Sequence, residues 1–153
     1  MNTLLFKKES KLSNYYICKV IYNNIEFSSS EAAYQSQKFC DISMQLRFVG
    51  LTPDQSKHLA RRWKQNWRAD WDTYKVNVMY EIVKNKMLQN TECLIELMNT
   101  NSMIIVEDTT DWHDNIWGYC RCDKCKNKEH TNYLGKILMQ LREEFRTGGI
   151  YIN

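Results

Sequence analysis

The stretch that decides the fold is residues 21–39, IYNNIEFSSSEAAYQSQKF. Apolar and polar residues alternate on both sides of Asn23-Asn24, and asparagine tolerates the positive φ of a tight turn, so the pattern predicts a β-hairpin. Ser28 and Glu31 have the spacing of a capping box, in which two side chains bind the free amides at a helix start. We therefore expect a hairpin followed at once by a helix.

Helical spacing of apolar residues recurs further along the chain. Thr52, Pro53 and Gln55 form a helix start, with an N-cap threonine and a proline in the first turn. The β-branched run MIIVE predicts a strand at 103–107. We expect helices over 29–40, 52–66, 70–89, 92–99 and 132–146, with irregular chain over 108–131. The predicted fold class is α+β: one helix-rich domain over 1–153 with a small β-hairpin and sheet.

Composition excludes several classes of protein. The net charge of +3 is too small to indicate nucleic-acid binding by itself, and no apolar run approaches the ~18 residues of a membrane span. The N-terminal residues MNTLLFKKESK lack a signal-peptide pattern, so we expect a cytoplasmic protein with no membrane partner. Thiols stay reduced in that compartment, and the dispersed Cys18, Cys40 and Cys93 are expected to be small buried residues. Dinucleotide, P-loop, nucleophile-elbow and zincin motifs are absent.

The predicted first helix carries the most informative polar residues. Glu31, Tyr34, Gln35 and Lys38 are spaced so that all four share one face. Glu31 and Lys38 lie two turns apart, roughly 10 Å along the axis, which leaves room for a ribose. Capping for Glu31 and solvation for Lys38 explain the same spacing equally well.

The second helix carries a cationic stripe. Lys57, Arg61, Lys64 and Arg68 are spaced by four, three and four residues. Such a stripe suits phosphate or pyrophosphate, since arginine offers paired donors in a fixed fork. A solvated helix face is the alternative. The tryptophans suit stacking on a flat base or packing in the core; they are Trp63, Trp67, Trp71, Trp112 and Trp117.

The irregular segment contains a cysteine cluster. Cys120, Cys122 and Cys125, with His130, supply three thiolates and one imidazole, a set that suits one structural zinc in tetrahedral geometry. Free surface thiols are the alternative.

Six blocks in order along the chain resemble the NADAR (YbiA-like) family. They cover about residues 10–146 and comprise LSNYY at 12–16, IYNNIEFSSSEAAYQSQKF at 21–39, SKHLARRW at 56–63, RADWDTYKVNVM at 68–79, VEDTTDWHDNIWG at 106–118 and NYLGKILMQLREEF at 132–145. The resemblance implies an α+β fold and N-glycosidase chemistry on ribosylated bases. The implied substrates are phosphoribosylamino-pyrimidine intermediates of riboflavin synthesis or ADP-ribosylated guanine, free or in nucleic acid.

The resemblance also implies roles for individual residues. It makes Glu31, Lys38 and Asp114 catalytic, with no cofactor required. The implied substrate-binding residues are Asn14, Gln35, Lys57, Arg61, Arg68, Asp70, Trp71, Trp117, Asn132 and Gly135. A non-catalytic module that binds ADP-ribose or an NAD-related ligand would use the same stripe and tryptophans. A zinc-dependent nucleic-acid binder is a third alternative.

Lys38 has two chemical roles open to it. A permanent cation would hold phosphate or neutralise Glu31, whereas a neutral amine would attack C1′ of the ribose and form an imine. The second role, which the resemblance favours, needs a pKa below the ordinary value near 10.4. Tyr34, Trp71 and the cationic stripe would lower it, and Glu31 would raise it, so we expect no tight ion pair between Glu31 and Lys38.

Overall fold

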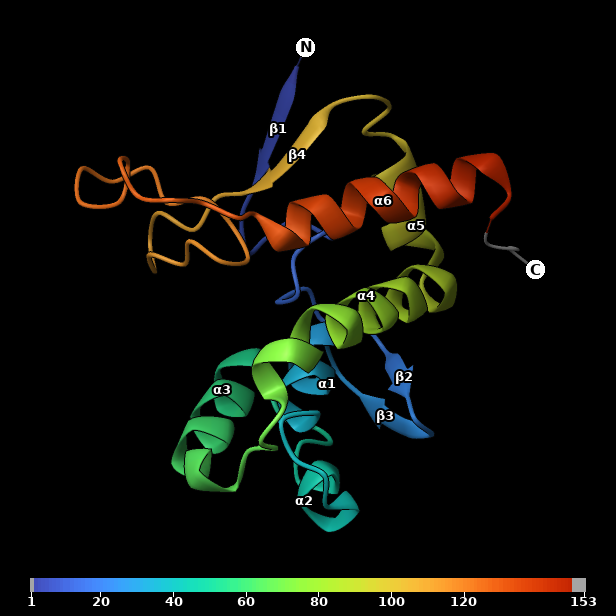
Figure 1. Cartoon of the computed structure of the whole chain (residues 1–153). Helices are drawn as coiled ribbons and strands as arrows, with labels where there is room; N and C mark the ends of the chain where they lie inside the picture. Colours follow the sequence, from blue (N-terminus) through green and yellow to red (C-terminus); the bar gives the residue numbers. More distant parts are fainter. Residues whose placement is uncertain (1, 150–153) are drawn as a thin grey trace. The chain divides into compact units, whose positions relative to one another are not determined.

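The computed structural model describes residues 2–149, which group into two compact units (Figure 1). One unit comprises residues 14–91, and the other comprises 1–13 together with 92–153. The chain is of mixed α+β class, as the sequence predicts. The single domain over 1–153 stays a prediction. Within the described residues, no helix combines the length and the apolar character needed to cross a membrane.

The 14–91 unit begins with the predicted hairpin. Strands β2 (Val20–Tyr22) and β3 (Ile25–Phe27) pair antiparallel, with Val20 opposite Phe27. Asn23 and Asn24 have φ of 50° and 66°, so both take the left-handed conformation that the tight turn requires.

Five helical segments complete this unit. They are α1 (Ser30–Ser36), α2 (Ile42–Leu46), α3 (Pro53–Arg62), the 3₁₀ turn η1 (Lys64–Asn66) and α4 (Trp71–Gln89). Helix α1 is central, because it contacts the hairpin, α2, α3 and α4, and all its residues are buried (Figure 1). At α3, Thr52 is the N-cap, as predicted, and with Gln55 it forms a capping box. Helix α2 is absent from the sequence prediction.

The other unit is a two-stranded parallel sheet covered by a helix. Strand β1 (Thr3–Phe6), which the sequence does not predict, pairs with β4 (Ile104–Glu107). Helix α5 (Thr91–Met98) precedes β4. The amphipathic α6 (Tyr133–Thr147) packs on β4 (Figure 1). Between β4 and α6 the chain is irregular, as predicted.

The three dispersed cysteines only partly match their prediction. Cys93 is buried and Cys18 is half-buried, but Cys40 is exposed. It lies beyond the end of α1 and just before α2, where the chain turns at the surface.

Candidate active site

Helix α1 begins one residue later than the sequence predicts. The N-cap is Ser29, whose Oγ accepts a hydrogen bond from the Ala32 amide at 3.1 Å. Ser28 instead donates its hydroxyl to the Leu51 carbonyl at 2.7 Å. The predicted capping box of Ser28 and Glu31 is therefore wrong, because a shift of one residue moves Glu31 out of the third helical position.

Glu31 is a buried carboxylate beside a lysine. Its side chain is 9% exposed, and Oε1 lies 3.9 Å from Nζ of Lys57, which comes from α3. Its amide donates to the Asn14 carbonyl at 3.1 Å, which fixes the helix start. Because water is largely excluded, this ion pair is screened less than an exposed one.

Lys38 lies in the turn that follows α1, since the helix ends at Ser36 and not at residue 40. The amide of Lys38 donates to the Gln35 carbonyl at 3.3 Å. Its carbonyl accepts from the Arg68 amide at 2.7 Å, so the segment before α4 holds Lys38 in place.

Three aromatic rings surround the Lys38 ammonium group. Nζ is 4.0 Å from the ring centre of Trp67, 5.7 Å from that of Tyr34 and 5.8 Å from that of Trp71. The Trp67 indole is fixed by a 2.8 Å hydrogen bond from Nε1 to the Ala60 carbonyl. The sequence analysis predicted that Tyr34 and Trp71 lie around Lys38, but it did not single out Trp67.

Burial among these rings lowers the pKa of Lys38 to about 8. The Glu31 charge acts in the opposite direction, while the charges of Arg61, Lys57 and Lys75 lower the pKa further. The aromatic faces attract a cation, but the loss of water outweighs that attraction. The sequence predicts the same directions: burial among aromatic rings and the cationic stripe lower the pKa of Lys38, and Glu31 raises it. The carboxylate of Glu31 has its ion pair with Lys57.

Gln35 has an unsatisfied acceptor. It is 5% exposed, and within residues 2–149 its Oε1 has no hydrogen-bond partner. A buried acceptor without a donor costs about 1–3 kcal/mol, so a donor supplied by a ligand or water would be favourable here. Asn14, by contrast, is held by protein groups: its Oδ1 accepts from Ser30 Oγ at 2.8 Å, and Nδ2 is 3.5 Å from the Met79 sulfur.

The cationic stripe is not continuous. Helix α3 ends at Arg62, which leaves Lys64 in η1 and Arg68 beyond it. Arg68 forms a two-pronged ion pair with Asp70, at 2.6 and 3.1 Å, and stacks 3.7 Å from the ring centre of Tyr74. Its hydrogen bond holds the pKa of Asp70 below its usual value. Arg61 is exposed and has no ion pair among the described residues.

The remaining predicted residues belong to the other unit. Asp114 accepts hydrogen bonds at Oδ1 from the amides of Ile116 and Trp117, at 2.8 and 2.9 Å, and so closes a turn. The Trp117 ring packs edge-on against Tyr133, with ring centres 6.0 Å apart. The catalytic role of Asp114 and the substrate contact of Trp117 stay predictions.

Asn132 and Gly135 join α6 to β4. Asn132 has φ of 50°; its Nδ2 donates to the Ile105 carbonyl at 2.9 Å, and its Oδ1 accepts from the Glu107 amide at 3.3 Å. A Cβ on Gly135 would lie 2.2 Å from the Ile105 oxygen, so only glycine permits this approach. These contacts show that both residues hold α6 against β4. Their contact with substrate stays a prediction.

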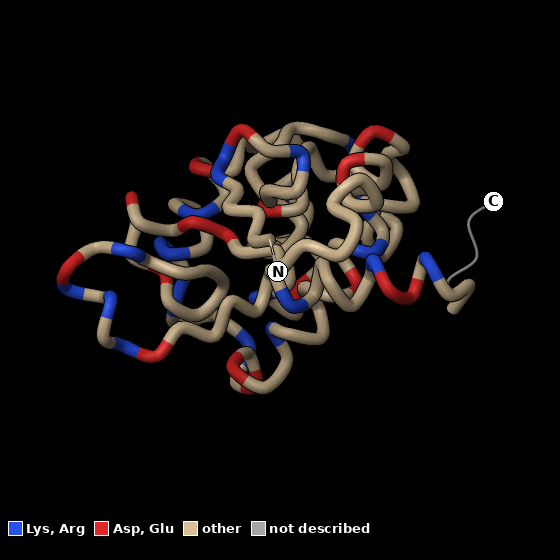
Figure 2. The backbone as a smooth tube through the Cα atoms, turned by 90° about the horizontal axis from the view of Figure 1, so that it is seen from above, with Lys and Arg blue, Asp and Glu red and all other residues tan. Residues whose placement is uncertain are grey.

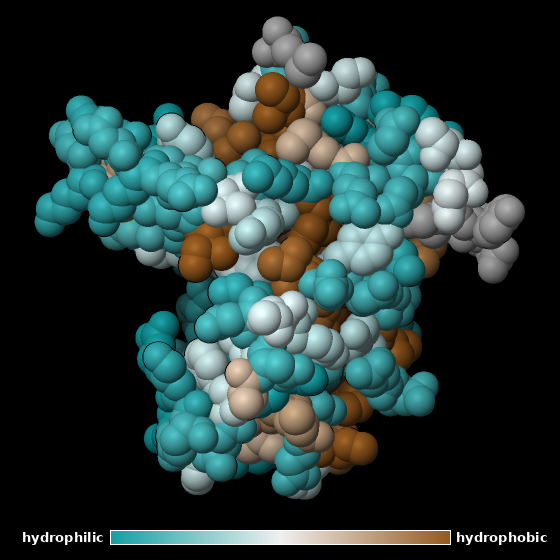
Figure 3. All heavy atoms as spheres, in the orientation of Figure 1, coloured by the Kyte–Doolittle hydropathy of each residue, from teal (hydrophilic) through white to brown (hydrophobic). Residues whose placement is uncertain are grey.

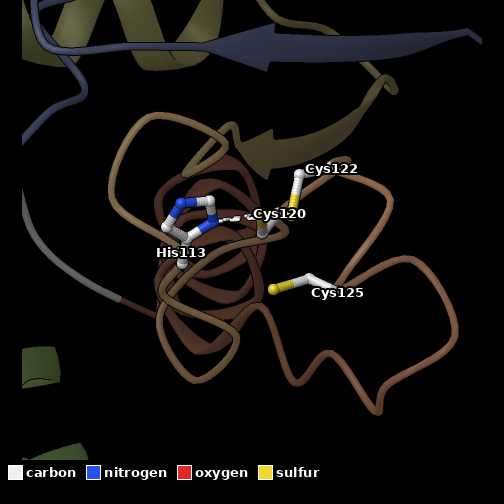
Figure 4. A group of neighbouring side chains, drawn as sticks. All are labelled: His113, Cys120, Cys122 and Cys125. Atoms are coloured by element: carbon white, nitrogen blue, oxygen red, sulfur yellow. Dashed lines mark hydrogen bonds between the residues drawn. The ribbon is translucent and has the colours of Figure 1, made fainter.

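The candidate metal ligands differ from the prediction in one residue. His113, and not His130, lies beside the three thiols of Cys120, Cys122 and Cys125 (Figure 4). His130 instead stacks on Tyr119, with ring centres 3.8 Å apart, and its Nε2 is 3.1 Å from the Cys120 carbonyl oxygen.

Comparison with known proteins agrees with this fold. The NADAR domain model matches residues 5–146. The NMR structure of the E. coli protein YbiA superposes with a TM-score of 0.80 at 23% identity, covering 97% of this chain and 89% of that one. The chain therefore belongs to the NADAR family and has the fold of YbiA.

Three relatives carry functional names. The chain is 33% identical over 144 residues to a riboflavin biosynthesis protein of Vibrio vulnificus, covering 92% of this chain but only 36% of that protein. It is 33% identical over 124 residues to an N-glycosidase of Nostoc punctiforme, covering 78% of this chain and 75% of that one. It is 29% identical over 134 residues to N-glycosidase YbiA of Shigella sonnei, covering 86% and 79%.

Proposed function

We propose that this protein is an N-glycosidase that hydrolyses the bond between C1′ of a ribose and a nitrogen of its base. Membership of the NADAR family and the names of the Nostoc and Shigella relatives support the reaction class. The observation that carries the proposal is the Lys38 amine, which is enclosed by aromatic rings and has a pKa of about 8.

A pKa near 8 makes Lys38 a usable nucleophile. Roughly a tenth of the side chain is neutral at pH 7, against well under a thousandth at the ordinary value. The neutral amine attacks C1′, and the C1′–N bond breaks with its electron pair going to the base. The base takes up a proton as it leaves. The attached sugar then opens to an imine, and water hydrolyses the imine to return the amine and the sugar, which leaves as ribose 5-phosphate or ADP-ribose.

Glu31 is the residue we assign to proton transfer. The Lys38 nitrogen must lose a proton after attack, and the departing base must gain one. Glu31 is a buried carboxylate whose charge acts on Lys38. Its ion-pair partner Lys57 lies 3.9 Å away on α3. The chemistry needs water and these side chains, and no cofactor.

Substrate recognition would use the remaining groups of this unit. The unpartnered Oε1 of Gln35 suits a ribose hydroxyl, which would supply the missing donor. Arg61, exposed and without an ion pair in the described chain, suits a phosphate. A phosphoribosyl or ADP-ribosyl substrate fits both requirements.

The deciding experiment presents both substrate classes to the full chain. Phosphoribosylamino-pyrimidine and ADP-ribosylated guanosine are incubated with the protein, and mass spectrometry follows release of the free base. Release from one of them identifies the substrate class. Tight binding of ADP-ribose with no base released from either compound would contradict the enzyme and support the binding module.

A further inference from the structure

We propose that His113, Cys120, Cys122 and Cys125 form a structural zinc site in the segment between β4 and α6. Figure 4 shows the four side chains directed toward one another, and their ligand atoms all lie within 4.8 Å of one another. In the described part of the chain, this is the one group of three or more His, Cys, Asp or Glu residues arranged in this way.

The distances fit tetrahedral zinc. Bonds of about 2.3 Å to sulfur and 2.0–2.1 Å to nitrogen place ligand sulfur atoms about 3.8 Å apart and sulfur and nitrogen about 3.6 Å apart. In the structure, Nδ1 of His113 is 3.2 Å from Sγ of Cys120 and 3.5 Å from Sγ of Cys122. Small outward shifts would admit the ion.

The two segments that carry the ligands are already held together. Tyr119 donates its amide to the Glu107 carbonyl at 2.8 Å, and Thr109 donates to the Tyr119 carbonyl at 3.1 Å. The buried carboxylate of Asp108 binds Arg121, at 2.8 Å, next to the first cysteine. Backbone pairing and an ion pair thus bring the two ligand-bearing segments together.

His113 has a backbone conformation that needs a reason. Its φ is 59°, in the left-handed region, which costs a residue other than glycine about 1 kcal/mol or more. The turn that produces this angle is closed by a 2.7 Å hydrogen bond from its amide to the Thr109 carbonyl. The conformation directs the imidazole at the thiols, and coordination would offset its cost.

The donor set selects the metal and its role. Three thiolates and one imidazole suit zinc, and four protein ligands leave no open position for water or substrate. Zinc with three thiolates carries one net negative charge. The surrounding segment 119–130 contains four Lys or Arg and two Asp or Glu (Figure 2), and its surface is hydrophilic (Figure 3). A segment with so few apolar side chains gains order from a metal instead of a core.

Zinc content tests the site directly. The full chain, purified without chelators and examined by native mass spectrometry, should carry about one zinc ion per chain. His113→Ala should weaken zinc binding, measured by competition with a chromophoric chelator, by more than about tenfold. His130→Ala and Cys40→Ser are the matched controls and should leave the affinity within about twofold, because neither side chain is a proposed ligand.

Protease sensitivity supplies a second measurement that does not depend on the histidine variant folding. Arg121, Lys124, Lys126 and Lys128 are exposed trypsin sites within the segment. A chelator should accelerate cleavage at these sites by about tenfold or more, and added zinc should reverse the effect, because binding stabilises only the ordered state. Less than about a tenth of a zinc ion per chain after incubation with zinc, or a disulfide among the three thiols, would overturn the proposal. Equal loss of affinity in His113→Ala and His130→Ala would also overturn the ligand set.

Discussion

The ammonium nitrogen of Lys38 lies 4.0 Å from the ring centre of Trp67, the nearest of the three aromatic rings around it. Trp67 is in turn fixed to the end of α3 by its hydrogen bond to Ala60. The packing of this ring excludes water from Lys38, which has no ion pair among the described residues.

Lys38→Arg should reduce release of the base by about 10³-fold or more, because arginine keeps the charge but supplies no neutral nucleophile. Borohydride added during turnover of the native protein should trap a ribosyl adduct on Lys38. Lys84→Arg, the same substitution at a lysine of α4 that the proposed mechanism does not use, is the control and should keep full activity. An active Lys38→Arg variant would leave Lys38 as a holder of phosphate.

The pH dependence of kcat/KM should follow the Lys38 amine. The reactive form is neutral, so activity should rise with pH through about 8 and level off above it. Lys75→Gln removes a positive charge that lowers this pKa and should move the rise to higher pH by roughly a few tenths of a unit. Lys84→Gln should leave the profile in place. Activity that falls as pH rises from 7 to 8 would contradict the amine mechanism.

Arg61→Glu should raise KM for a phosphorylated substrate by about tenfold or more and change KM for the dephosphorylated nucleoside much less. Arg62→Glu is the matched control, with the same change in charge at the next position of α3. Only Arg61 of the two acts on the Lys38 pKa. Steady-state kinetics with both substrates measures these KM values. Similar increases in KM for the two variants would mean that Arg61 attracts the substrate only through its charge and does not bind the phosphate directly.

Gly135→Ala should destabilise the protein by about 2–3 kcal/mol, because the new methyl group would overlap the Ile105 oxygen and the Asn132 side chain. The melting temperature should fall by roughly 5–10 °C in a calorimetric scan. Gly149→Ala is the control, since its nearest neighbour would be 3.5 Å away. A melting temperature equal to that of the control would mean that α6 moves away from β4 at little cost.

The sequence predicts those elements whose signals are local. The Asn23-Asn24 turn, the Thr52 N-cap and the apolar spacing of α4, α5 and α6 all depend on residues a few positions apart. Strand β1 could not be found in this way, because its partner β4 lies about 100 residues further along the chain. Helix α2 is only five residues long and has too few positions to show periodicity.

The candidate site was predictable in its residue types more than in its contacts. The spacing placed Glu31, Gln35 and Lys38 together, and the structure keeps all three in one unit. Ser28 and Ser29 are equally suitable N-cap residues by type, and in the structure Ser28 binds the Leu51 carbonyl, which leaves Ser29 as the N-cap. His113 could not be identified, because a left-handed turn at this residue, and not a regular ligand spacing, brings it to the cysteines that follow.

The segment that carries the cysteines is anchored at both ends. Tyr119 is bonded to Glu107 on one side, and on the other the amides of Thr131, Tyr133 and Leu134 donate to the carbonyls of Asn115, Ile116 and Trp117 at 2.9–3.0 Å. We therefore expect the chain between these anchors to accept changes in length and composition that leave β4 and α6 in place. A shortened variant that joins Cys120 to Thr131 through a few glycines should keep the fold.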